Sequence, residues 1–151
     1  MTIRVGVNGF GRIGRNFFRA VKQSGADVEI VAANDLGAIA EMAHLLKYDS
    51  VMGRLPYSVE VADDGIVVDG QKLAITALRD PKELPWGELG VDVVVESTGF
   101  FTDRDKAAAH LDAGAPVVVI SAPATNADAT FVVGVNDDTF DAASHKVVSN
   151  A

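Results

Sequence analysis

The sequence predicts an α/β fold with a doubly wound, mostly parallel sheet and an inserted antiparallel hairpin region. Three observations indicate it. Short apolar runs alternate with stretches of helical periodicity, as in consecutive strand–helix–strand units. The run 91–96 is almost continuously apolar, as expected of a parallel strand covered on both faces. A glycine-rich turn also joins the first run to the first helical stretch. Because a domain typically holds about 100–200 residues, we expect residues 1–151 to form one domain.

The first third of the chain alternates strand and helix. We expect a strand over 3–7, a helix over 11–24 that ends at Gly25, a strand over 28–33 and a helix from 39 to about 48. In both helical segments apolar residues recur every three or four positions, which places them on one face.

Residues 55–79 interrupt this alternation. The runs 58–62 and 66–69 flank Asp63-Asp64-Gly65, which is typical of a hairpin turn, and a further strand follows over 73–78. We expect this region to be an antiparallel insertion.

The last third returns to the alternation. After the strand at 91–96, Thr102 is expected to cap a helix that runs to Ala113, with Asp105 at its third position and Gly114 closing it. Further strands are expected at Val117–Ile120, Thr130–Val133 and Lys146–Val148.

The composition argues against several classes of protein. Thirteen Lys and Arg against 21 Asp and Glu give a net charge of −8, which argues against nucleic acid or an anionic membrane as a partner. Zero cysteines exclude disulfides, Cys-ligated metals and a thiol nucleophile within these residues. No apolar run approaches the ~20 residues of a membrane span, and no signal peptide is evident, so we expect a cytoplasmic protein.

The first strand runs into a glycine-rich turn, Asn8-Gly9-Phe10-Gly11-Arg12-Ile13-Gly14. This is the spacing of a dinucleotide-binding (Rossmann-type) domain. Gly9 permits the tight turn, Gly11 lets the backbone approach a pyrophosphate, and Gly14 allows close packing of helix and strand.

The helix that follows this turn favours an anion at its N-terminus. Its free N–H groups and dipole place the amides of Arg12 and Ile13 toward phosphates, and the Arg12 guanidinium adds a full charge.

Asp35 lies 21 residues after Gly14, at the end of the second predicted strand, where a ribose-binding carboxylate is expected. Its charge would repel a 2′-phosphate, and neither Asn34 nor Leu36 offers a compensating cation, so NAD is favoured over NADP. An alternative role for Asp35 is to cap the helix that begins near Ala38.

The sequence closely resembles the NAD-binding domain of phosphorylating glyceraldehyde-3-phosphate dehydrogenase over all 151 positions. The motifs that carry the resemblance are Val7-Asn8-Gly9-Phe10-Gly11-Arg12-Ile13-Gly14-Arg15, Ala33-Asn34-Asp35, Leu46-Lys47-Tyr48-Asp49-Ser50, Pro85-Trp86-Gly87, Glu96-Ser97-Thr98-Gly99, Ile120-Ser121-Ala122-Pro123, Gly134-Val135-Asn136 and Ser149-Asn150-Ala151.

The resemblance implies a role for individual residues. It implies that Arg12 and Ile13 bind the pyrophosphate and that Asp35 binds the adenosine ribose, and it places Arg79 beside the adenine. Thr98, Gly99 and Ser121 would line the path toward the nicotinamide. The expected cofactor-binding residues are Gly9, Phe10, Gly11, Arg12, Ile13, Gly14, Asn34, Asp35, Arg79, Thr98, Gly99 and Ser121.

Simpler roles remain open for several of these residues. Thr98-Gly99 also fits a turn that leads into a helix, Ser121 a turn that ends a strand, and Arg79 a solvated charge.

In the resembled family, Ser149-Asn150-Ala151 is followed by the catalytic cysteine, and a second, catalytic domain follows in a homotetrameric enzyme. We therefore expect no catalytic residue here, and we expect the chain to bind NAD without oxidising glyceraldehyde 3-phosphate by itself. None of His44, His110 and His145 is expected to be catalytic, and no metal site is expected. The alternatives are a stand-alone NAD-sensing module and the cofactor domain of an erythrose-4-phosphate dehydrogenase.

Overall fold

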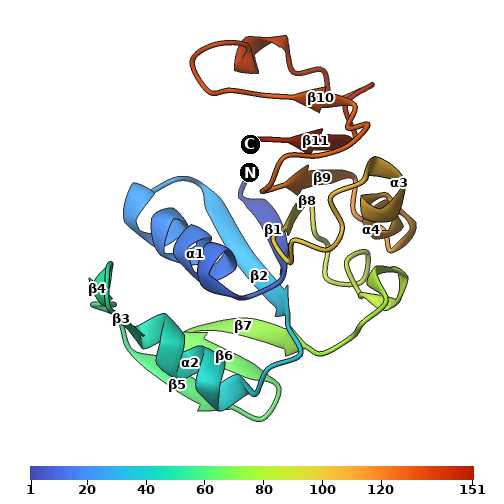
Figure 1. Ribbon diagram of the computed structural model, residues 1–151. Helices are drawn as coiled ribbons and strands as arrows, with labels where there is room; N and C mark the ends of the chain where they lie inside the picture. The colour runs from blue at the N-terminus through green and yellow to red at the C-terminus, as the bar shows by residue number, and fades with distance from the viewer.

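A nine-stranded, mostly parallel sheet forms the centre of the computed structural model, which describes residues 1–151 (Figure 1). The strands from β10 to β7 are mutually parallel, whereas β6 and β5 run antiparallel at one edge. In spatial order the strands are β10 (Ala129–Thr130), β11 (Val147–Ser149), β9 (Val117–Ile120), β8 (Val93–Glu96), β1 (Ile3–Asn8), β2 (Val28–Asn34), β7 (Gln71–Thr76), β6 (Gly65–Val68) and β5 (Val59–Ala62). The predicted fold class is confirmed.

Helices cover both faces of the sheet. On one side lie α1 (Arg12–Ser24) and α2 (Ile39–Lys47), and on the other α3 (Arg104–Ala107) and α4 (Ala109–Asp112) (Figure 1). The change of side follows from the strand order, because the chain moves from β1 outward through β2 and β7 and returns to the other flank of β1 with β8. None of these helices is long and apolar enough to cross a membrane.

A bulge in β2 sorts its side chains between two cores. Val5 pairs with Ile30 and Gly6 with Ala32, which leaves Val31 as the extra residue. Ile30 consequently joins the core beneath α1 and α2, whereas both Val31 and Ala32 face the opposite core around Trp86.

The predicted helix over 102–113 is wrong in two details. Asp103 rather than Thr102 caps it, because the Asp103 carboxylate accepts from the Asp105 amide at 2.9 Å. The helix is also divided into α3 and α4 at Ala108. There the Leu111 amide donates to the Ala108 carbonyl three residues earlier, a 3₁₀-type bond that tightens the turn.

The strand predicted over 130–133 is much shorter, because β10 ends at Thr130. The side chain of Asn136 replaces the ladder beyond that point. Its Oδ1 accepts from the Val132 amide at 2.7 Å and its Nδ2 donates to the Thr130 carbonyl at 3.0 Å.

The region 55–79 is antiparallel only in part. β5 and β6 form the predicted hairpin, but β7 pairs parallel with β2 and so belongs to the main winding. A separate two-stranded sheet, β3 (Tyr48–Asp49) with β4 (Gly53–Arg54), was not expected. Two 3₁₀ helices, η1 (Pro81–Glu83) and η2 (Asp137–Thr139), complete the elements.

Asp128 fastens the last strands to α3. Its carboxylate accepts from Arg104 Nε at 2.8 Å and from the amides of Lys146 and Val147 at 2.9 Å each. Partial burial raises the pKa of Asp128, but the hydrogen bonds from Arg104, Val147 and Lys146 together outweigh it and lower the pKa to about 2.

This pKa predicts a loss of stability in acid. The folded-state pKa lies below the ordinary value of 3.8, so the stabilisation is complete above pH 3.8 and is lost as the pH falls toward 2. The difference corresponds to about 2 kcal/mol of unfolding free energy. Urea unfolding of the wild type and Asp128→Asn should therefore differ by about that amount at neutral pH and converge near pH 2. A constant difference at every pH would contradict this role.

Candidate functional site

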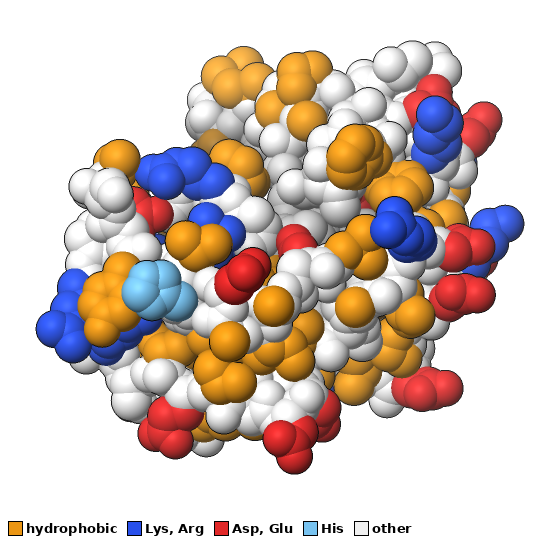
Figure 2. Space-filling model, turned by 60° about the horizontal axis from the view of Figure 1, so that its bottom comes forward, with side chains coloured by type: hydrophobic (Ala, Val, Ile, Leu, Met, Phe, Trp, Pro, Cys, Tyr) orange, Lys and Arg blue, Asp and Glu red, His pale blue; other side chains and the backbone are white.

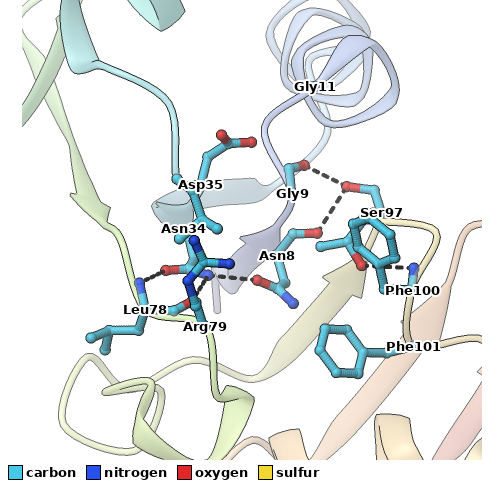
Figure 3. A pocket seen from close by; sticks show the side chains of 12 residues that line it. Asn8, Gly9, Gly11, Asn34, Asp35, Leu78, Arg79, Ser97, Phe100 and Phe101 are labelled. Atoms are coloured by element: carbon cyan, nitrogen blue, oxygen red, sulfur yellow. Dashed lines mark hydrogen bonds between the residues drawn. The ribbon is translucent and has the colours of Figure 1, made fainter.

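A cavity of about 410 Å³ opens where the strands reach their carboxyl ends, beside the point at which the strand order reverses around β1. In Figure 3, Asn34 and Arg79 lie on one side, Phe100 and Phe101 on the other, and Asn8 and Gly9 between them. Twelve residues line the cavity: Asn8, Gly9, Gly11, Asn34, Asp35, Leu36, Leu78, Arg79, Ser97, Thr98, Phe100 and Phe101.

The surface of the molecule carries no single charged area on the side shown in Figure 2. Hydrophobic side chains cover much of that face, and acidic and basic side chains are scattered among them.

The glycine turn brings three segments of backbone close together. Gly9 has a φ of 92°, and a Cβ there would lie 2.8 Å from the Thr98 amide nitrogen. A Cβ on Gly14 would lie 2.2 Å from the carbonyl oxygen of Gly9. Around Gly11, by contrast, a Cβ would meet no atom within 4 Å, so this residue faces open space.

The N-terminus of α1 is free of side-chain capping. Gly11 is the N-cap residue, and no side chain bonds to the first turn. Its amides therefore retain the capacity to bind an anion, which the helix dipole also favours. The arrangement fits a phosphate group at this position.

The Asp35 carboxylate follows β2 and holds the glycine turn. Its Oδ2 accepts from the Phe10 amide and its Oδ1 from the Gly37 amide, both at 2.9 Å. Since the N-cap residue of α2 is Ala38, the alternative that Asp35 caps this helix is wrong. A carboxylate has about four acceptor positions, so about two remain for a ligand in the cavity.

Two basic side chains, Arg12 and Arg15, lie beside the glycine turn. Arg12 is half-exposed and lies 3.5 Å from the Asp49 carboxylate. The amides of Met52 and Val51, followed in strength by Arg12, lower the pKa of Asp49 below its ordinary value. Arg15 Nη1 donates to the Phe10 carbonyl at 3.0 Å, and burial lowers the pKa of this guanidinium.

The segment 97–101 forms the wall opposite Asp35. Ser97 Oγ donates to the Gly9 carbonyl at 2.6 Å, which fixes this wall to the glycine turn. Thr98 Oγ1 accepts from the Phe100 amide at 3.1 Å. Phe100 itself is 80% exposed, so it offers an apolar ring to a ligand or to solvent.

The sequence-predicted residues separate into two groups. Gly9, Gly11, Asn34, Asp35, Arg79 and Thr98 line the cavity. The others lie outside the lining. Phe10 is buried in the core and offers only its backbone, Ile13 is exposed, and Ser121 Oγ donates to the Glu96 carbonyl at 3.2 Å.

Asn34 lines the cavity with its amide already occupied. Nδ2 donates to Asn8 and Leu78, while Oδ1 accepts from Thr76 and Leu78. All its side-chain hydrogen bonds are thus made within the protein, and Asn34 shapes the cavity rather than reaching out to a ligand.

Sequence reasoning missed six lining residues: Asn8, Leu36, Leu78, Ser97, Phe100 and Phe101. Each lies at, or a few positions after, the carboxyl end of a predicted strand, which was the available signal. Two adjacent aromatic residues directly after Gly99 were a second one.

Comparison with known proteins agrees with this geometry. The family model of the glyceraldehyde 3-phosphate dehydrogenase NAD-binding domain matches residues 3–104. Glyceraldehyde-3-phosphate dehydrogenases of Streptomyces coelicolor, Mycobacterium tuberculosis and Geobacillus stearothermophilus are 58%, 59% and 57% identical to the chain, respectively. Each alignment covers 100% of this chain but only 45–46% of the relative, so the chain spans about half the length of these curated relatives.

The close approach at Gly14 predicts a large effect of one methyl group. In Gly14→Ala the new Cβ is forced against the Gly9 carbonyl oxygen, which lowers the free energy of unfolding by about 3 kcal/mol. The higher helix propensity of alanine returns about 1 kcal/mol of it. We expect a net loss of about 2 kcal/mol in urea unfolding. The matched control Gly11→Ala, in open space, should lose less than about 1 kcal/mol. Equal losses in both variants would contradict the account of this turn.

Proposed function

Because the chain belongs to the family of glyceraldehyde-3-phosphate dehydrogenase NAD-binding domains, we propose that its cavity is the NAD site. The observation that carries this proposal is the juxtaposition of the uncapped α1 N-terminus with the Asp35 carboxylate. An anion-binding group and a hydroxyl-binding group thereby share one cavity, as a dinucleotide requires.

The pyrophosphate lies at the glycine turn in this proposal. The open surface over Gly11 lets phosphate oxygens reach the amides of Arg12 and Ile13. Arg12 and Arg15 add positive charge nearby, although Asp49 offsets part of it. Phe10 and Gly14 act through the backbone, by shaping the turn.

The adenosine half lies on the Asp35 side. The remaining acceptor positions of Asp35 take the ribose hydroxyls, and its negative charge disfavours a 2′-phosphate. Arg79, which the resemblance assigns to this place, forms the wall beside the adenine together with Leu78.

The nicotinamide half extends past the carboxyl ends of β8 and β9. Thr98 and Gly99 follow β8, and Ser121 follows β9, so all three lie at the same edge of the sheet. When bound, NAD would supply the nicotinamide ring that accepts a hydride from the substrate, and these three residues would orient that ring.

The whole protein is proposed to be a cytoplasmic, homotetrameric glyceraldehyde-3-phosphate dehydrogenase. In this proposal residues 1–151 form its cofactor domain, and a further domain supplies the nucleophile and the substrate phosphate sites. The absence of cysteine from these residues supports that division, because the family reaction needs a thiolate.

Asp35→Asn tests the cofactor preference. Losing a charged acceptor for a ribose hydroxyl costs about 1.5 kcal/mol, so calorimetric titration should give an about tenfold weaker NAD complex. The ratio of NAD to NADP affinity should fall at the same time, since the repulsive charge is gone. Asp63→Asn removes one exposed carboxylate in the hairpin turn and is the matched control. An unchanged NAD to NADP ratio in Asp35→Asn would contradict the assignment.

The 151-residue chain is expected to bind NAD without turnover. With NAD, inorganic phosphate and glyceraldehyde 3-phosphate present, no sustained increase in NADH absorbance should occur, because no thiol is available to attack the aldehyde. Sustained NADH formation by a mass-verified sample would show that chemistry proceeds without a cysteine.

A further inference from the structure

A fully buried histidine lies behind the cavity and takes no part in the proposed NAD contacts. His110, on α4, has 0% exposure and is not among the residues that line the cavity. The sequence predicted of it only that it is not catalytic. The hydrogen bonds of its imidazole ring indicate a more specific role.

The partners of His110 fix its tautomer. Trp86 Nε1, which can only donate, lies 3.0 Å from His110 Nδ1, so Nδ1 is the acceptor. The ring proton is then on Nε2, which donates to Glu96 Oε2 at 2.7 Å. A neutral, singly oriented imidazole therefore joins the indole to the carboxylate.

Glu96 has a donor for each of its acceptor positions. Oε2 accepts from His110 and from Asn8 Nδ2, the latter at 2.7 Å. Oε1 accepts from the amide of Thr98 at 2.9 Å and from its hydroxyl at 2.5 Å. The carboxylate is 2% exposed, and this complete set of donors is what makes its burial tolerable.

These contacts determine where the 97–101 wall lies. Glu96 holds Thr98 by both its amide and its hydroxyl, and Thr98 in turn accepts from the Phe100 amide. The His110 ring also meets the Phe101 ring edge-on, with centroids 6.4 Å apart. The wall is thus supported from behind at two points, both of which depend on His110.

We infer that His110 and Glu96 are positioning residues for cofactor binding, acting through Thr98 and Phe101 rather than through contact with NAD. This inference rests on the proposed function. If the wall is already ordered before NAD binds, less free energy of binding is lost in ordering it, and the affinity is higher. Without the His110 donor, one position of Glu96 is unsatisfied, and the carboxylate no longer has one preferred orientation toward Thr98.

The test compares NAD affinity across variants that are shown to be folded by circular dichroism. His110→Leu should raise the Kd for NAD about tenfold, because it removes the donor to Glu96. His110→Gln should stay within about threefold of the wild type, since its amide can donate to Glu96 and its oxygen can accept from Trp86. Glu96→Gln, in which an NH₂ group must face donors, should again weaken binding about tenfold.

A matched control separates positioning from general destabilisation. Val118→Ala removes apolar volume from the buried cluster that Val118 forms with Ala107, Ile120 and Val147, and it removes none of these hydrogen bonds. It should lower the unfolding temperature but leave the Kd within about twofold. Trp86 is the only tryptophan, so the emission of the protein reports the surroundings of this indole, including its hydrogen bond to His110. Its emission should change in His110→Leu and not in Val118→Ala.

These measurements test the positioning role of His110 and Glu96 separately from NAD binding itself. A wild type that does not bind NAD would overturn both. A wild type that binds NAD, with a folded His110→Leu that binds it equally well, would overturn only the positioning role, as would an equal loss of affinity in Val118→Ala. If His110→Leu does not fold, undiminished binding by Glu96→Gln overturns the positioning role.

Discussion

One row of hydrogen bonds along the carboxyl edge of the sheet, buried except at its β7 end, holds the cavity in shape. The row consists of the last residues of four neighbouring parallel strands, Thr76, Asn34, Asn8 and Glu96, which are paired in register. Their side chains bond in sequence from β7 to β8, and His110 extends the row to α4. Because a one-residue slip of any strand would break this row, the same contacts fix both the strand register and the position of the cavity walls.

At this edge of the sheet, the side chains below the cavity have all their hydrogen bonds made within the protein, while a few groups above it remain free for a ligand. The side chains of Asn34 and Glu96 each make four hydrogen bonds within the protein, so no donor or acceptor of these groups below the cavity is left over. Above it, the α1 N-terminus and the spare positions of Asp35 remain available. A dinucleotide therefore meets a rigid floor and a few unsatisfied groups, which is the arrangement that favours specific binding at low ordering cost.

Local patterns predicted the parts of this site that are local in sequence. The glycine spacing and Asp35 were found because a turn and a strand end have characteristic residues at fixed separations. The hydrogen bonds of His110 and Asn34 were not found, because their partners lie 14 to 44 residues away in the sequence and only the folded sheet brings them together. The division of the 102–113 helix and the early end of β10 were missed for a different reason. Single local hydrogen bonds decided them, a 3₁₀ bond at Ala108 and the side-chain bonds of Asn136, and the hydrophobic pattern does not report such bonds.

A crystal structure of the 151-residue protein with NAD would show most directly whether this row of hydrogen bonds holds the walls of an NAD site. We expect the pyrophosphate at the Gly9–Gly14 turn and ribose hydroxyls at the Asp35 carboxylate. We also expect the 97–101 wall to be unmoved, with Glu96 still bonded to Thr98. NAD bound elsewhere, or a Glu96 carboxylate turned away from Thr98 on binding, would contradict this role of the row.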